Sequence, residues 1–267
     1  MGNDIFRSSG LTSITITRNV SQIGLSPFSA CTQLTEINVD EANPYFSSLD
    51  GVLTDKNRTT IVAYPAGKGK RYIIPDGITK IGTHSFFACY PITYIHMPNS
   101  VKTIELFAFA SCTDLDTVIL GNSVDSIEVA AFRINDRLKT IYSMNPIPPA
   151  AHTGAFDSFN SFFIQCTLHV PVGSLQAYKN AEVWKNFKNI VENNFTGIER
   201  PSPDKAKIFG NKNSIAFRNI EPGTDISIYD TTGKCIKTFA VDGDCEIPFP
   251  SGIYLIKYAG RTVKIIL

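Results

Sequence analysis

The chain has 267 residues, enough for one large or two modest domains, and 43% of them are hydrophobic, which excludes a chain that is disordered throughout. Its 25 Lys and Arg residues balance 24 Asp and Glu residues, so the net charge of +1 removes the electrostatic reason to expect a nucleic-acid partner. No stretch approaches the roughly 20 apolar residues that a membrane-spanning helix needs, so we expect no transmembrane segment. The start, Met1–Asp4, lacks the basic residues and apolar core of a signal peptide.

A spacing of 23 residues begins near the N-terminus. Residues 5–11 resemble the second half of a repeat unit, and Leu11, Ile14 and Ile16 then recur 23 positions later as Leu34, Ile37 and Val39. The motif L-x-x-L-x-L is typical of one short strand whose apolar side chains point inward.

The stretch of residues 43–71 interrupts this spacing with 12 additional residues. It reads as a β-hairpin, with strands at 46–49 and 52–54 around the turn pair Asp50-Gly51, followed by a second turn and a strand at 59–64.

The centre of the chain shows the repeat most clearly. Ile92, Leu115 and Leu138 begin three strands at intervals of 23. Further columns hold the same interval: Ile81, Ile104 and Ile127; Phe86, Phe109 and Phe132; Cys89 and Cys112. One such coil cannot cover its own apolar side, so the pattern predicts a solenoid of stacked coils with one parallel sheet. Its inward positions include Ile14, Ile37, Tyr72, Ile95, Val118 and Ile141.

These residues carry a family resemblance. The run Ile74-Pro-Asp-Gly-Ile78-Thr-Lys-Ile81-Gly-Thr-His-Ser-Phe86-Phe-Ala-Cys89 resembles the BspA-like, or Treponema-type, leucine-rich repeat. The hairpin ending in Ala63-Tyr64-Pro65 and the closing unit from Leu168 to Phe187 are also similar to that family. The resemblance covers residues 5 to 192 and implies a leucine-rich-repeat solenoid with irregular or helical return segments.

The sequence at the end of the repeat domain, residues 1–192, predicts a helix that caps the solenoid. Ser174 is a suitable N-cap residue, and apolar residues recur at helical spacing over about 174–188. Such a helix would lay its apolar face over the last coil, as terminal repeats require.

A polar, Pro-bearing linker at 193–202 separates this domain from residues 203–267. Short alternating strands follow at 215–217, 225–229, 235–239, 253–258 and 262–267, and their spacing predicts a small all-β sandwich. The phrases Ile226-Ser-Ile-Tyr-Asp230-Thr-Thr-Gly233-Lys234 and Ser251-Gly-Ile-Tyr-Leu-Ile-Lys257 resemble the C-terminal sorting domain of the Bacteroidetes type IX secretion system. That resemblance implies passage across an outer membrane and attachment at the surface.

Motifs for catalysis and for cofactors are not found, so we predict no enzyme, no cofactor and no metal site. Asp242-Gly-Asp244-Cys-Glu246 offers carboxylates at alternate positions, but a charged hairpin turn explains it better than calcium binding. Cys31, Cys89 and Cys112 share one repeat position, which favours packed thiols over a disulfide between coils. For Cys235 and Cys245, a cross-strand disulfide and two separate thiols are equally supported.

Register also predicts which side chains face outward on the strands. The position between the last two apolar residues yields Thr15, Asn38, Ile73, His96, Ile119, Tyr142 and His169, and the position two before it includes Arg71 and Tyr94. Exposed aromatic and apolar clusters often mark partner sites. The candidate partner-binding residues are therefore Tyr94, His96, Ile119, Tyr142, Ile73 and His169.

The resulting hypothesis is a secreted or cell-surface protein that binds protein or glycan partners. The alternative is a structural or accessory cell-envelope protein with no dedicated ligand. The extracellular location follows from the resemblances alone, and the sequence indicates neither the ligand nor the oligomeric state.

Overall fold

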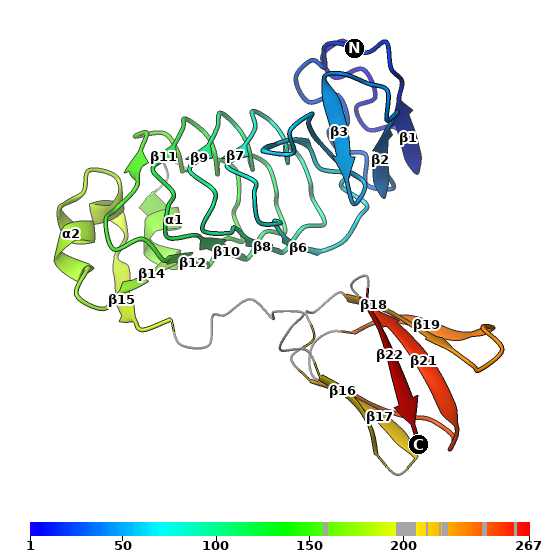
Figure 1. Cartoon of the computed structure of the whole chain (residues 1–267). Coiled ribbons are helices and arrows are strands. Elements are labelled where there is room, and N and C mark those ends of the chain that lie inside the picture. The colour runs from blue at the N-terminus through cyan, green and yellow to red at the C-terminus, as the bar shows by residue number, and fades with distance from the viewer. Residues whose placement is uncertain are drawn as a thin grey trace. The chain divides into compact units, whose positions relative to one another are not determined.

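The computed structural model describes residues 1–156, 160–195, 207–211, 213–218, 220, 224–241, 245–258 and 261–267 (Figure 1). The chain divides into two compact units, Met1–Asn194 and Phe195–Leu267. The expected linker lies outside the described residues from position 196 onward, as do residues 242–244 and 259–260.

The first unit is a solenoid whose main sheet is parallel and six-stranded. Its order is β15-β14-β12-β10-β8-β6, and β1 pairs separately with β2 in the same parallel sense. Ile95 pairs in register with Val118, and Val118 pairs with Ile141, so the inward column runs as predicted and all three are buried. The strands are β1 (Ser13–Ile16), β2 (Glu36–Val39), β6 (Arg71–Ile73), β8 (Tyr94–His96), β10 (Thr117–Leu120), β12 (Thr140–Ser143), β14 (Thr167–Pro171) and β15 (Asn189–Asn193).

The return segments form a second sheet, so the expectation of one parallel sheet was wrong. Figure 1 shows β7, β9 and β11 along the side of the coils opposite β6, β8 and β10. The strands β7, β9 and β11 have two residues each, a run too short to show an alternating pattern in the sequence. The members in chain order are β3 (Phe46–Leu49), β4 (Val52–Asp55), β5 (Thr60–Ala63), β7 (Lys80–Ile81), β9 (Thr103–Ile104), β11 (Ser126–Ile127) and β13 (Ala150–Ala151).

The inserted hairpin extends this second sheet. The strands β3, β4 and β5 lie where the sequence predicted them, and β5 pairs in parallel with β7. At the β3–β4 turn, Asp50 and Gly51 both have positive φ, of 49° and 72°, as the favoured two-residue hairpin turn requires.

After the two-residue strand, each coil turns with a repeated backbone conformation. Non-glycine residues four positions apart adopt positive φ, at His84 and Ala88 and again at Phe107 and Ser111. Alternate backbone N–H groups in the turn donate to the next coil, for example His84 N to Leu106 O at 3.0 Å and Phe86 N to Ala108 O at 2.8 Å. These bonds between coils offset the cost of the left-handed residues.

The turns place one aromatic ring per coil in the core. Phe86 stacks on Phe109 with ring centroids 4.7 Å apart, and Phe109 stacks on Phe132 at 5.2 Å. Tyr64 continues the stack on one side and Phe156 on the other. This ladder fills the space between the two sheets with rings whose quadrupoles favour offset stacking.

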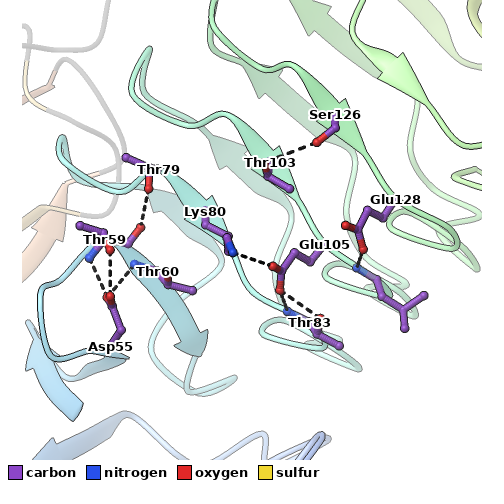
Figure 2. A network of polar contacts seen from close by, with 11 residues as sticks. Asp55, Thr59, Thr60, Thr79, Lys80, Thr83, Thr103, Glu105, Ser126 and Glu128 are labelled. Carbon is purple, nitrogen blue, oxygen red and sulfur yellow. Dashed lines mark hydrogen bonds and ion pairs between the residues drawn. The ribbon is translucent and has the colours of Figure 1, made fainter. Parts of the chain in front are cut away.

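Two glutamates at the same repeat position brace the turns (Figure 2). Glu105 Oε2 accepts hydrogen bonds from the backbone N and the hydroxyl of Thr83, both at 3.0 Å, while its Oε1 pairs with Lys80 Nζ at 3.0 Å. One coil later, Glu128 Oε2 accepts from Leu106 N at 3.1 Å. Each carboxylate thus holds the residue that precedes a left-handed position.

The cysteine column also bonds one coil to the preceding one. Cys112 Sγ donates to Phe86 O at 3.1 Å, and Asn135 Nδ2 at the equivalent position donates to Phe109 O at 3.0 Å. Cys31, Cys89 and Cys112 are buried and form no disulfide. The preferred interpretation as packed thiols is confirmed, with a hydrogen bond as an additional reason for the residue type.

The C-terminal cap of the solenoid differs from the single helix expected over 174–188. A short helix α1 (Asn160–Gln165) precedes β14. Helix α2 (Leu175–Asn180) follows β14 and has Ala181 as its C-cap residue. A 3-10 turn η1 (Trp184–Asn186) comes next, and β15 then adds a strand to the main sheet. Ser174 makes no side-chain cap, because Glu192 Oε1 accepts from Gly173 N at 2.8 Å and Leu175 N at 3.2 Å instead. The expected apolar cover is present, since Tyr178, Trp184 and Phe187 are buried in the solenoid core.

The second unit contains two antiparallel sheets in its described residues. Their orders are β16-β17-β20 and β19-β18-β21-β22. Ile215 and Phe217 from one sheet share an apolar core with Ile226, Ile228 and Ile256 from the other. The strands are β16 (Lys207–Asn211), β17 (Ser214–Arg218), β18 (Thr224–Tyr229), β19 (Cys235–Val241), β20 (Cys245–Pro248), β21 (Ile253–Tyr258) and β22 (Arg261–Ile266), of which β16 and β20 were not predicted.

Replacement of Phe109 tests the ring ladder. Phe109→Ala is expected to lower the free energy of unfolding by about 3–5 kcal/mol, because the ring is fully buried between two others and its removal leaves a cavity. Chemical denaturation measures this loss. A loss below about 1 kcal/mol would show that the ladder is not part of the core.

Glycine substitution tests the left-handed turns. Ser111→Gly should leave the free energy of unfolding unchanged or raise it by up to about 1 kcal/mol, since Ser111 has φ of 61° and glycine adopts that value without steric cost. The control Ser126→Gly, in strand β11, should lower it by about 0.5–1 kcal/mol. Equal losses in both variants would contradict the turn assignment.

Candidate partner-binding face

The outward side of five neighbouring strands, β6 to β14, is termed the sheet face. Parallel register brings its members into two adjacent columns, because the side chains of residues i and i+2 lie on the same side of a strand. One column is Ile73, His96, Ile119, Tyr142 and His169; the other is Arg71, Tyr94, Thr117, Thr140 and Thr167. All six predicted candidate residues therefore lie on one face, while Thr15 and Asn38 pair in the separate sheet of β1 and β2.

Ring contacts connect the strands of the sheet face. The guanidinium carbon of Arg71 lies 3.8 Å from the centre of the Tyr94 ring, and Tyr94 meets His96 edge-on at 6.5 Å. At the other end, Tyr142 and His169 stack with centroids 4.5 Å apart. The two pairs on neighbouring strands, Arg71 with Tyr94 and Tyr142 with His169, were not foreseen as contacts. In each pair the two residues occupy the same column on adjacent strands, and that shared repeat position is the sequence signal for the contact.

The sheet face is less open than predicted. His96 and Ile119 are buried, with exposed fractions of 5% and 4%, so the expectation of exposure was wrong for these two. In register, Ile119 lies between His96 and Tyr142 on strands about 4.8 Å away, where large neighbours cover a smaller side chain. Tyr94, Tyr142 and His169 are half-buried and still present part of their rings.

His169 supplies a polar group that the solenoid does not satisfy. Its Nδ1 is buried and has no hydrogen-bond partner among the described residues. Burial lowers the pKa of His169 below its usual value, so the ring is neutral near pH 7. The His169 ring is covered on one side by the stacked Tyr142.

A second cluster of rings on the turn edge was missed at the sequence level. His84 stacks on Phe107 at 5.1 Å, and Phe87 meets His84 edge-on at 5.2 Å. The spacing of 23 between His84 and Phe107 was a signal for it, but the two residues differ in type and fall in a turn without a strand or helix period. Burial lowers the pKa of His84 as well.

The structure also bears on the predicted cysteine pair, the acidic run, metal sites and membrane-spanning helices. Cys235 pairs in register with Tyr229 and Cys245 with Phe217, on different sheets, so the cross-strand disulfide is wrong and none joins them. The acidic pair Asp242 and Asp244 lies outside the described residues. Within the part of the chain that the structure describes, no group of three or more His, Cys, Asp or Glu side chains is placed to hold a metal ion. No helix there is long and apolar enough to cross a membrane.

Comparison with known sequences places these features in a family. A profile of the BspA type leucine rich repeat region matches residues 1–49 and 65–168 in six copies, which is more than half of the chain. The chain belongs to the BspA-type leucine-rich-repeat family. The gap between the matched ranges contains β4 and β5 of the inserted hairpin of this BspA-type protein, while β3 ends the first matched range. A search of curated proteins finds no match.

Solved structures share the fold of this BspA-type protein. The pneumococcal vaccine antigen PcpA is 19% identical, with a TM-score of 0.50, and the match covers 72% of this chain and 58% of that one. A leucine-rich repeat protein from Eubacterium ventriosum is 22% identical, with a TM-score of 0.54, and the match covers 72% and 51%. The chain thus spans between half and three fifths of these proteins, and at such identities the likeness concerns the fold alone.

Acidification tests the two half-buried histidines, His84 and His169. Their folded pKa values are lowered from the unfolded value of about 6.5, so their stabilisation is complete above that pH and is lost as the pH falls through the folded pKa values. The melting temperature should therefore fall less between about pH 7.5 and about pH 5 in the double variant His84→Gln/His169→Gln than in the parent protein. The change in melting temperature between the two pH values is compared, so any stability that the substitutions cost at both pH values cancels. Parallel curves would contradict burial of the neutral rings.

Proposed function

We propose that this protein is a secreted or surface-displayed binding protein whose sheet face contacts a protein or glycan partner. The observation that carries the proposal is the gathering of three half-buried rings, Tyr94, Tyr142 and His169, on one sheet by the parallel register. Aromatic side chains anchored in this way supply large contact area at low entropic cost.

Family membership supports a role outside the cell. The chain belongs to the BspA-type repeat family, and one protein that shares its fold is described as a vaccine antigen. A repeat surface that stacks coils in register presents an extended face, which is suited to contact with a large partner. We extend the extracellular location to this chain on these grounds.

The second unit fits a sorting or attachment role in this proposal. Its resemblance to a type IX sorting domain rests on phrases that include the turn from Asp230 to Lys234. There, Asp230 Oδ1 accepts hydrogen bonds from Thr232 N at 2.9 Å and Lys234 N at 3.0 Å, and Gly233 has φ of 84°. The carboxylate thus organises an exposed turn between β18 and β19. We propose that this unit, following a linker at 193–202, directs the solenoid to the cell exterior.

The alternative is a structural or accessory envelope protein with no dedicated ligand. The burial of His96 and Ile119 favours it, because the centre of the sheet face then has less apolar surface to offer a partner. The two candidates predict different results when rings at the edge of the face are removed.

The double variant Tyr94→Ala/Tyr142→Ala is the test. We expect attachment to cells, matrix protein or glycan surfaces to fall by about tenfold or more. The melting temperature should be nearly unchanged, since both rings lie outside the ring ladder. The matched control is Tyr90→Ala, an exposed tyrosine on the same unit, which should attach like the parent. Unchanged attachment in the double variant would reject the sheet face, and no attachment by the parent to any surface would favour the structural alternative.

A further inference from the structure

A pocket lies where the inserted hairpin meets the end of β2, away from the sheet face. Its volume is about 340 Å³, near the lower end for small-ligand sites. The lining combines two carboxylates, two cations, hydroxyls and one ring: Asp40, Glu41, Lys56, Arg58, Ser47 and Phe46.

The hairpin walls of this pocket are held rigidly. Asn43 is fully buried, donates to Thr17 O at 2.9 Å and Val20 O at 3.0 Å, and accepts from Tyr45 N and Phe46 N at 2.8 Å each. Every hydrogen-bonding position of this amide is thus used to fasten the start of the hairpin to the preceding coil. A pocket with fixed walls binds a ligand at a lower entropic cost.

The opposite end of the hairpin is braced by Asp55 (Figure 2). Its Oδ1 accepts from Thr59 N and Thr60 N at 2.7 Å each, and its Oδ2 accepts from the Thr59 hydroxyl at 2.8 Å. Between these residues Arg58 has φ of 58°, and its backbone N donates to Asp55 O at 3.0 Å. The tip therefore holds the arginine in a conformation that its sequence alone would not favour.

Arg58 has donors available within the pocket. Its Nε donates to Ser47 Oγ at 3.0 Å, and its two Nη groups have no partner among the described residues. Lys56 Nζ, by contrast, is engaged by the carbonyls of Asn43 at 2.5 Å and Glu41 at 3.3 Å. The pocket thus presents one planar guanidinium, which matches a carboxylate in bidentate geometry.

The charged residues of the pocket restrict the chemical class of ligand that it can bind. Asp40 and Glu41 balance Lys56 and Arg58, so a dianion such as phosphate would meet two carboxylates, while an uncharged ligand would leave the guanidinium unused. Asp40 Oδ1 accepts from Ala42 N at 2.9 Å and its Oδ2 pairs with Arg18 Nε at 3.5 Å, and both contacts lower the pKa of this carboxyl. A ligand with one carboxylate and several hydroxyls fits both kinds of charged group, because its carboxylate can accept from the guanidinium and its hydroxyls can donate to the acidic residues.

We propose that this pocket binds a monosaccharide unit bearing a single carboxylate, of the hexuronic or sialic acid type. Arg58 binds the carboxylate, Asp40 and Glu41 accept from the hydroxyls, and Phe46 contacts the apolar side of the ring. The site is independent of the sheet face, so it gains or loses support separately from the proposed function.

Binding of D-glucuronate, N-acetylneuraminate and glucose to the full chain, measured by ligand-observed NMR and calorimetry, tests this assignment. At least one acidic sugar should bind about tenfold or more tightly than glucose, and Arg58→Ala should remove that preference. Arg58→Gly is the second variant, since glycine retains the positive φ if alanine disturbs the tip. Arg133→Ala, at an exposed arginine on another turn, should bind like the parent.

The outcomes that overturn the proposal are distinct. Equal binding of glucose and both acidic sugars, or no binding of any, removes the carboxylate assignment. Inorganic phosphate that competes as strongly as the acidic sugars shows a general anion site. Retained preference in both Arg58 variants, with melting temperatures equal to that of the parent, excludes Arg58 as the binding group.

Discussion

The rest of the solenoid depends on the backbone hydrogen bonds between consecutive coils. At each turn, alternate N–H groups such as those of His84, Phe86 and Ala88 donate to carbonyls of the next coil. These bonds satisfy buried peptide groups and hold neighbouring coils in register. Because the register is held, the rings stack, the thiols and Asn135 reach the preceding coil, and equivalent strand positions align. The left-handed residues are tolerated for the same reason, since the bonds they enable offset their conformational cost.

Both candidate binding regions follow from this constraint in different ways. On the sheet face, exact repetition places side chains from distant parts of the sequence side by side, so an aromatic surface forms without any contiguous motif. The hairpin pocket arises where repetition fails. The inserted residues cannot continue the coil. The Asn43 side chain fastens the start of the hairpin to the preceding coil, and the Asp55 side chain holds the turn within the hairpin. The sheet face is suited to a macromolecular partner with a large contact area, and the hairpin pocket is suited to a single small chemical group.

Sequence reasoning succeeded where a single period governs burial. The sequence predicted the inward column through Ile95, Val118 and Ile141 and the phenylalanine ladder, because each depends on residue type at a repeated position. The hairpin strands were predicted instead from the turn pair Asp50-Gly51 and the strand-forming residues beside it. It failed at the two-residue strands β7, β9, β11 and β13 of the second sheet, which carry no alternation, and at the cap, where Glu192 replaces Ser174 as the capping group. Of the two alternatives for Cys235 and Cys245, the structure has separate thiols, because β19 and β20 belong to different sheets and proximity in sequence does not determine sheet membership.

The sequence by itself determined the 23-residue period, the composition of the core and the membership of the sheet face. These properties depend on which residues are apolar and how far apart they lie, and both can be counted along the chain. Only the tertiary structure decided that His96 and Ile119 are buried, that Arg71 lies over Tyr94, and that Arg58 keeps donors available beside two carboxylates. Exposure and hydrogen-bond satisfaction depend on neighbours that belong to other coils, and their positions exist only once the coils have stacked.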